Sequence, residues 1–197
     1  MMDLPYRQDN LIGMPLDHYL GQLAQADPEE ISRRLGIPQE AGTFTLQILN
    51  ETKTITLPDF ADEGWQDRWR ILFARYLLEG KKVLPSERFV SYSELPWGEV
   101  YQEKFRQRCI LRMAGTFGNR IEAFRELAQK LGAVPTEGSG CRYEFTFLPD
   151  LKLQFILWEG DEEFPASAQI LFTDNFQEAF SAEDRVVICE YILGKMR

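Results

Sequence analysis

The sequence predicts an α+β fold, in which antiparallel β-hairpins pack against about five helices. Two regions show apolar residues at every second position, whereas the segments around them show apolar residues three or four positions apart. The predicted strands are grouped rather than alternating singly with helices, which favours antiparallel sheets. With 197 residues, 44% of them hydrophobic, the chain can form one domain over residues 1–197. A glycine-rich loop at residues 132–140 is the place where it could divide.

The N-terminal part is expected to contain two short helices and a pair of strands. Residues 15–25 have helical spacing. The run Asp-Pro-Glu-Glu at residues 27–30 is typical of a helix start, with an N-cap, a proline at the first position and acids in the first turn. Gly36 ends this helix. Alternating apolar residues on either side of a turn at residues 50–51 then predict a hairpin.

The middle of the chain is expected to be helical. Residues 62–79 carry a wide apolar face. The longest helix follows Pro96, and its apolar residues recur at every fourth position up to Phe117. Because an α-helix has about 3.6 residues per turn, this stripe drifts slowly around the helix. Asn119 is expected to cap a further helix that runs to residue 131.

The C-terminal part is expected to form three strands and a helix. Alternation over residues 143–147 and 151–157 predicts a second hairpin, and the run SAQILF predicts a third strand. Ser181 caps the last helix, with Asp184 in the reciprocal position of a capping box. The predicted core comprises Phe44, Leu46, Ile48, Trp69, Phe73, Leu77, Phe105, Cys109, Phe145, Phe147, Leu153, Phe155, Leu157, Ile170, Phe172, Val187 and Tyr191.

The negative charge is concentrated in one block. Residues 144–184 hold ten of the 31 acidic residues and one of the 22 basic ones, which accounts for the whole net charge of −9. Such a surface repels phosphate backbones, so we expect no nucleic-acid partner. No stretch approaches the roughly 18 apolar residues of a membrane span. The first ten residues lack the basic and apolar regions of a signal peptide, so we expect a cytoplasmic protein without a membrane partner.

The residues that usually carry catalysis are sparse. Cys109, Cys141 and Cys189 are scattered, which predicts buried thiols in a reducing compartment rather than disulfides, a zinc site or an iron–sulfur cluster. His18 is the single histidine, so a nucleophile with a histidine base is disfavoured. Phosphate-loop and dinucleotide fingerprints are absent from the sequence. We therefore expect no cofactor and assign no catalytic residue, although an enzyme remains open.

The segment WEGDEEFP at residues 158–165 is the candidate site, because it places four carboxylates within five residues. If a strand continued through the segment, the alternate acids would point the same way. Three interpretations stay open: a solvated hairpin end, an interaction surface, and a carboxylate site that binds a hard cation or acts as an acid–base pair. The candidate binding residues are Trp158, Glu159, Asp161, Glu162, Glu163 and Asp174.

A basic stripe accompanies the apolar stripe of the longest helix. It consists of Lys104, Arg108 and Arg112, which lie four residues apart. It is either a helix face that pairs locally with Glu103 or with the acidic C-terminal block, or a patch that binds an anion or an acidic partner. Three charges are too few to indicate DNA binding.

Four runs of the sequence resemble the family named domain of unknown function 3786. They are LFARYLLEG, RFVSYSELPWGEVYQEKF, FGNRIEAFRELAQKLGA and LWEGDEEFPASAQILFTDNFQEAFSAEDRVVICEYIL, and the similarity extends from about residue 20 to the end. The family is found in anaerobic bacteria and archaea and has no established activity. Some members resemble fusions to an iron–sulfur-binding domain of the kind seen in corrinoid proteins of one-carbon metabolism. This chain has no clustered cysteines for such a cluster.

The resemblance implies an anaerobic setting and an iron–sulfur or corrinoid protein as partner. Together with the residues, it favours a non-catalytic binding or interaction module with an acidic C-terminal surface. The alternative is a carboxylate-based metal-binding protein or enzyme that uses the acids from Glu159 to Glu163. A third interpretation is purely structural: the acids only keep a hairpin end in solvent.

Overall fold

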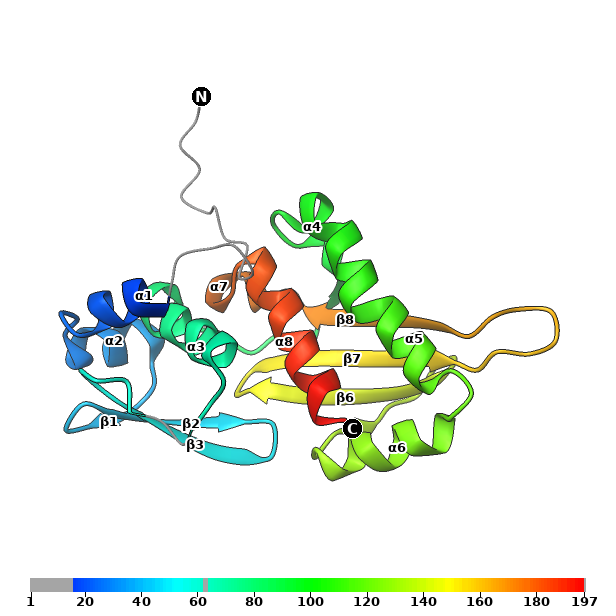
Figure 1. The fold of residues 1–197 in the computed structure, drawn as a ribbon, viewed down its shortest axis with the longest axis horizontal. Coiled ribbons are helices and arrows are strands. Elements are labelled where there is room, and N and C mark those ends of the chain that lie inside the picture. Colours follow the sequence, from blue (N-terminus) through cyan, green and yellow to red (C-terminus); the bar gives the residue numbers. More distant parts are fainter. Residues whose placement is uncertain (1–15, 62–63, 197) are drawn as a thin grey trace. The chain divides into compact units, whose positions relative to one another are not determined.

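The computed structural model describes residues 16–61 and 64–196 (Figure 1). It contains helices and two antiparallel sheets, which confirms the predicted α+β class. The described residues form two compact units, one of residues 16–45 and 53–82 and the other of residues 46–52 and 83–196. The glycine-rich loop at residues 132–140 lies inside the second unit.

Three helices lie in the first unit: α1 (Leu16–Leu23), α2 (Pro28–Leu35) and α3 (Asp67–Glu79). Both predicted signals of α2 are confirmed, because the Asp27 side chain accepts the Glu29 amide at 3.0 Å and Gly36 adopts φ 69°. The Arg34 side chain donates to the carbonyls of Leu77, at 2.6 Å, and Gly80, which ties α2 to the end of α3.

The helix predicted over residues 62–79 begins at Asp67, and residues 62–63 lie outside the described part. The preceding residue Gln66 is extended and provides no side-chain cap. Trp65 therefore precedes the helix, yet its ring packs against Phe73 with 4.7 Å between centroids. Its apolar contact explains why the periodicity extended the prediction too far towards the N-terminus.

The first sheet has the order β1-β2-β3, formed by Gln39–Glu40, Thr43–Ile48 and Glu51–Thr56. The predicted hairpin is thus confirmed, with Leu49 at φ 56° in its turn. The tip of the hairpin belongs to the second unit. There the Leu49 amide donates to the Phe147 carbonyl at 3.0 Å, and the Asn50 side chain donates to the Lys130 carbonyl at 2.9 Å.

The second unit contains a five-stranded antiparallel sheet of order β4-β8-β7-β6-β5. The predicted hairpin and third strand are its centre, and the short strands β4 and β5 complete its edges. The turn between β6 and β7 places Asp150 at φ 65°, a conformation that aspartate tolerates better than most residues. The strands are Phe89–Ser91 (β4), Val134–Pro135 (β5), Cys141–Leu148 (β6), Leu151–Trp158 (β7) and Ser167–Thr173 (β8).

Helices of the second unit cover this sheet. Helix α5 contacts β7 and β8, and α6 contacts β6 (Figure 1). Helix α8 begins with the predicted capping box of Ser181 and Asp184. A 3₁₀ turn at Tyr92–Glu94 precedes α4. The α-helices are Gly98–Phe105 (α4), Leu111–Phe117 (α5), Ile121–Lys130 (α6), Phe176–Ala179 (α7) and Ala182–Lys195 (α8).

The longest predicted helix is interrupted by a π-helical turn at Arg106–Ile110 between α4 and α5. A spacing of four residues overruns a 3.6-residue turn, whereas the wider π turn takes up the extra residue. Consequently Phe105, Cys109, Met113 and Phe117 all remain buried along one line. Trp97, the first member of the predicted stripe, is 51% exposed.

All seventeen residues predicted for the core are buried. Phe145 and Phe155 pack with ring centroids 4.8 Å apart on the central strands, and Tyr92 stacks on Phe105 at 4.2 Å. Within the described residues, no helix has the length and apolar character needed to cross a membrane.

Candidate functional site

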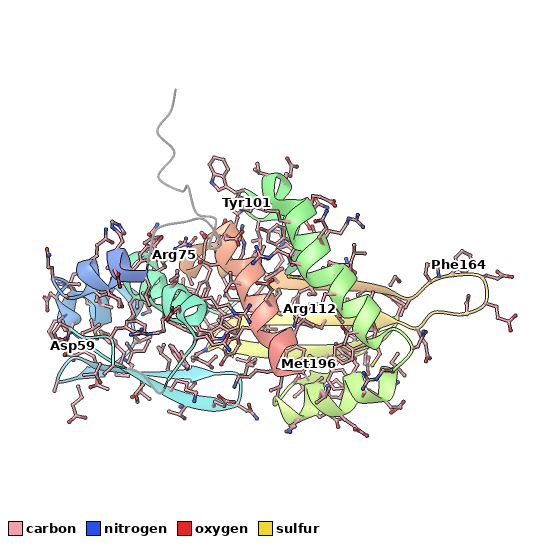
Figure 2. All side chains as sticks on the ribbon, in the orientation of Figure 1. Asp59, Arg75, Tyr101, Arg112, Phe164 and Met196 are labelled. Carbon is pink, nitrogen blue, oxygen red and sulfur yellow. The ribbon has the colours of Figure 1, made fainter. Side chains whose placement is uncertain are left out.

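The predicted acidic segment forms the connection between β7 and β8. Strand β7 ends at Trp158 and β8 begins at Ser167, so the segment does not continue the strand. Its four carboxylate residues are exposed. Phe164 lies at the far end of this connection and is 68% exposed (Figure 2). We call residues 159–166 the acidic loop.

Asp161 holds the acidic loop in shape. Its Oδ1 accepts the backbone amides of Glu163 at 2.8 Å and Phe164 at 2.7 Å, and its own amide donates to the Phe164 carbonyl at 2.9 Å. These amide donors, that of Phe164 first, stabilise the charged form and lower the pKa of the Asp161 carboxyl. The carboxylate therefore serves a local turn of the kind that aspartate commonly forms.

The remaining predicted site residues do not converge on one point. Asp174 follows the far end of β8, where its Oδ1 accepts the Ser86 hydroxyl at 2.6 Å. The seven residues of β8 separate it from the acidic loop, at about 3.3 Å per residue. Within the described residues, no group of three His, Cys, Asp or Glu side chains is arranged to hold a metal ion. The metal-binding alternative thus remains a prediction without convergent ligands.

Trp158 anchors the base of the acidic loop. It pairs with Ser167 across β7 and β8 and is half-buried. Gly140, at φ 77°, packs against its indole so closely that a Cβ there would lie 2.9 Å from Nε1. Only glycine therefore fits this contact, and the indole supports the strand end rather than projecting freely into solvent.

A cavity of about 650 Å³ lies between the acidic loop and the end of α5. Leu111, residues 114–116 and residues 118–120 contribute one wall, and Gly160, Asp161 and residues 164–166 contribute the other. We call this space the loop groove. Of the six predicted site residues, Asp161 lines the groove, and the sequence prediction missed the helical wall. The small residues in the run AGTFG at 114–118 were the available signal, because small side chains leave room beside a helix.

Two glycines at the end of α5 play different roles in the loop groove. At Gly118 a Cβ would lie 2.1 Å from the Ala166 Cβ, and the Gly118 carbonyl accepts the Gly160 amide at 3.3 Å. This glycine lets the helix end touch the loop. A Cβ added at Gly115 would instead meet no atom within 4 Å. Gly115 therefore leaves open the space that the groove occupies.

The rim of the loop groove is both apolar and charged. Leu111 is 48% exposed on one side and Phe164 projects from the other. Asp161 adds a carboxylate, and Arg120 supplies a cation at the start of α6. Arg120 occupies the N-cap of α6 without a side-chain cap hydrogen bond. The prediction that Asn119 caps this helix is therefore wrong, and Asn119 lines the groove instead.

The basic stripe is partly neutralised within the second unit. Arg108 Nη1 donates to Glu183 Oε1 at 2.6 Å, and its Nε and Nη2 bind both oxygens of Glu190. Burial by itself would lower the pKa of Arg108. The hydrogen bonds to Glu190 and Glu183 have the larger effect, so the pKa of Arg108 is raised. The Nζ atom of Lys104 lies 5.4 Å from the centroid of the Tyr101 ring. Arg108 thus pairs with Glu183 of the acidic C-terminal block, as one of the two interpretations predicted, and also with Glu190 beyond that block.

The three cysteines are free and buried, as predicted. Cys109 Sγ lies 3.6 Å from the Val186 carbonyl oxygen. Burial, followed by the neighbouring Cys109 thiol, raises the pKa of Cys189 well above its ordinary value. Thiols in this protonated state are poor nucleophiles.

Comparison with known proteins gives one match. The family model described as "Domain of unknown function (DUF3786)" matches residues 27–195, which is nearly the whole chain. Searches of curated proteins and of solved structures found no match. The chain belongs to the DUF3786 family, as the four resembling runs of its sequence predicted.

Proposed function

We propose that this protein is a non-catalytic binding module, and that the loop groove binds a basic segment of a partner protein. The observation that carries the proposal is the position of a large open cavity beside an exposed acidic loop. Binding sites are usually clefts that combine apolar surface with placed polar groups, and this groove has both kinds of lining. Exposed Leu111 and Phe164 on opposite rims provide apolar contact area for such a segment.

Charge favours a cationic partner. The acidic block carries the whole net charge of the chain; the four acids of the loop are exposed, and Asp161 among them lines the groove. Opposite charge speeds association and selects between partners. Arg120 on the other rim provides a site for a carboxylate or a backbone carbonyl of the same segment.

The chemistry of the described side chains supports binding over catalysis. A general base should have a pKa near the working pH, whereas the Asp161 carboxyl has a lowered pKa and is engaged by two amides. His18 is an exposed residue of the first unit and pairs with Gln22 at 3.0 Å. The buried Cys189 thiol has a raised pKa.

The family resemblance supplies a class of partner. We extend the proposal to a basic, partly apolar segment of an iron–sulfur or corrinoid protein in an anaerobic cell. Affinity capture from an anaerobe that encodes this chain, with the wild-type protein and a Phe164→Ala variant as baits, should recover such a protein with the wild type only. Equal recovery with both baits argues against the groove as the contact site.

A direct test uses a displayed library of random peptides and the full-length chain. We expect enrichment of peptides with several Lys or Arg residues and at least one large apolar residue. Phe164→Ala and Glu162→Gln should each weaken the selected peptides. Leu84→Ala and Glu178→Gln are matched controls, because Leu84 is 70% exposed and Glu178 is an exposed acid on α7. Failure to enrich any peptide, or equal binding by all four variants, contradicts the proposal.

A further inference from the structure

The outer edge of β8 is only partly covered. Strand β8 pairs with β7 from Ser167 to Phe172, but with β4 only from Leu171 to Thr173. Its other end, residues 167–170, therefore has one neighbouring strand in the described part of the chain. A strand edge of this kind presents unpaired backbone N–H and C=O groups.

The hydrogen bonds show which residues present these groups. The Asp174 amide donates to the Arg88 carbonyl at 2.9 Å, so the backbone of Asp174 points towards the β4 side. Backbone N–H and C=O groups point to alternate sides along a strand. The backbone groups of Phe172, Ile170 and Ala168 therefore point to the same side as those of Asp174. The pairing of β7 with β8 has no register shift between Phe172 and Ser167, so the alternation of backbone direction continues as far as Ala168. Ala168 thus directs its N–H and C=O away from β7, beyond the end of β4.

The open edge adjoins the loop groove. Ala166 lines the groove and directly precedes Ser167, the first residue of β8, so the groove adjoins the end of the strand that carries Ala168. Along the chain, the acidic loop leads directly into the edge. A strand that paired with Ala168 and extended past Ser167 would therefore lie next to the groove and the acidic loop.

The 3₁₀ turn at Tyr92–Glu94 contacts β8, but residues 167–170 lack three other features that block strand addition. Proteins protect open edges with prolines, charged side chains or bulges, whereas the residues Ser-Ala-Gln-Ile at 167–170 carry no charge and no proline. The register shows no bulge here. The acidic loop that leads into the edge carries four carboxylates, against one cation, Arg120, on the opposite rim of the groove, and this excess favours a cationic segment. A second copy of the chain offers no cation within its own 158–170 and carries a net charge of −9, so self-pairing is disfavoured.

We propose that the basic segment binds as an additional β-strand on the outer edge of β8, paired with Ala168. This inference rests on the proposed function and specifies how the segment is held. Main-chain hydrogen bonds to Ala168 contribute affinity, and the groove reads the side chains on one face of the segment. Basic side chains of the bound segment lie near the acidic loop and complement the charge of its carboxylates.

N-methylation of a selected peptide tests the proposal without altering the protein. Each residue of the best library peptide is methylated in turn on its backbone nitrogen, and the Kd for the full-length chain is measured. Strand addition predicts a period of two: loss of one hydrogen bond weakens binding by about tenfold at alternate positions, and by at most about twofold between them. A uniform response, or a three- to four-residue period, overturns strand addition.

Amide hydrogen exchange gives an independent readout. In the free protein the outward Ala168 amide should exchange fast, whereas the Gln169 amide, which points towards β7, should be protected. Saturating peptide should slow Ala168 exchange by at least about tenfold and leave Gln169 unchanged, since only the first gains a partner. Unchanged exchange at Ala168 contradicts the proposal.

A proline pair completes the experiment. Ala168→Pro removes only the outward donor and should keep the melting temperature near that of the wild type while abolishing peptide binding. Gln169→Pro should lower the melting temperature, because it removes a ladder hydrogen bond. If peptides bind through Phe164 without alternation in the N-methyl series, strand addition is wrong and the groove proposal stands. If no peptide is selected, both proposals fail.

Discussion

Arg108 of the π-helical turn binds Glu190 of α8 through two parallel hydrogen bonds. Nε lies 3.0 Å from Oε1 and Nη2 lies 2.7 Å from Oε2. The same guanidinium reaches Glu183, whose side chain is 1% exposed. This fork joins the turn to the C-terminal helix across 82 residues of sequence. It removes Arg108 from the set of charges that a partner could use.

Substituting Arg108 should strongly destabilise the protein. Arg108→Met retains most of the aliphatic volume but leaves the Glu183 carboxylate buried without this cation. Removing one partner of a buried ion pair costs about 3–5 kcal/mol, and we expect a loss in that range by urea unfolding. Arg106→Met is the matched control, because Arg106 pairs with Glu103 at an exposed site on the same turn. That change should stay within about 0.5 kcal/mol.

Alanine substitutions at the two glycines near the end of α5 should change the free energy of unfolding in opposite directions. Gly118→Ala places a Cβ against Ala166 and should cost about 1–3 kcal/mol, as overpacking does. Gly115→Ala meets no atom and should stabilise the helix by about 0.5–1 kcal/mol, because alanine loses less backbone entropy. Thermal unfolding of both variants measures the difference. Equal effects would show that the helix end does not touch the loop.

Tyr76 should make the protein sensitive to alkali. Burial raises its pKa to about 12 from 10.0, and Arg34 only partly offsets this. A raised acid pKa means that the folded state holds the proton longer than the unfolded state. The protonated Tyr76 therefore contributes fully to the free energy of unfolding below pH 10. This contribution, roughly 3 kcal/mol, is lost as the pH rises through about 12. Urea unfolding at several pH values should show a smaller alkaline loss in Tyr76→Phe than in the wild type.

Asp161 should control the conformation of the acidic loop at low pH. Its pKa is lowered by the Phe164 and Glu163 amides, so the charged form supports the turn above the ordinary value of 3.8. This support is lost as the pH falls through the lowered pKa that Asp161 has in the folded protein. A nuclear magnetic resonance titration should show the amides of Glu163 and Phe164 moving together with the Asp161 carboxyl. Asp161→Asn should keep the turn and Asp161→Ala should lose it, as seen by faster exchange of both amides.

Local signals determined much of the fold from sequence. Asp27 and Gly36 bounded α2 as expected, and Ser181 with Asp184 began α8, because caps depend on residues within one turn. The alternation in β6 and β7 placed their buried faces correctly, since a strand shows its period over a few residues. The sequence also marked the acidic segment before the third predicted strand, while a solvated hairpin end, an interaction surface and a carboxylate site stayed open as its interpretations.

The tertiary structure decided what joins distant segments. The wall of the loop groove from residues 111–120, the partner Glu190 of Arg108 and the short cover of β8 by β4 have no local pattern in the sequence. Each depends on how side-chain volumes and strand lengths meet after packing. A period identifies which face of an element is buried, but not which other element covers it. That is why the sequence located the charged loop, and only the fold placed a groove and an open strand edge beside it.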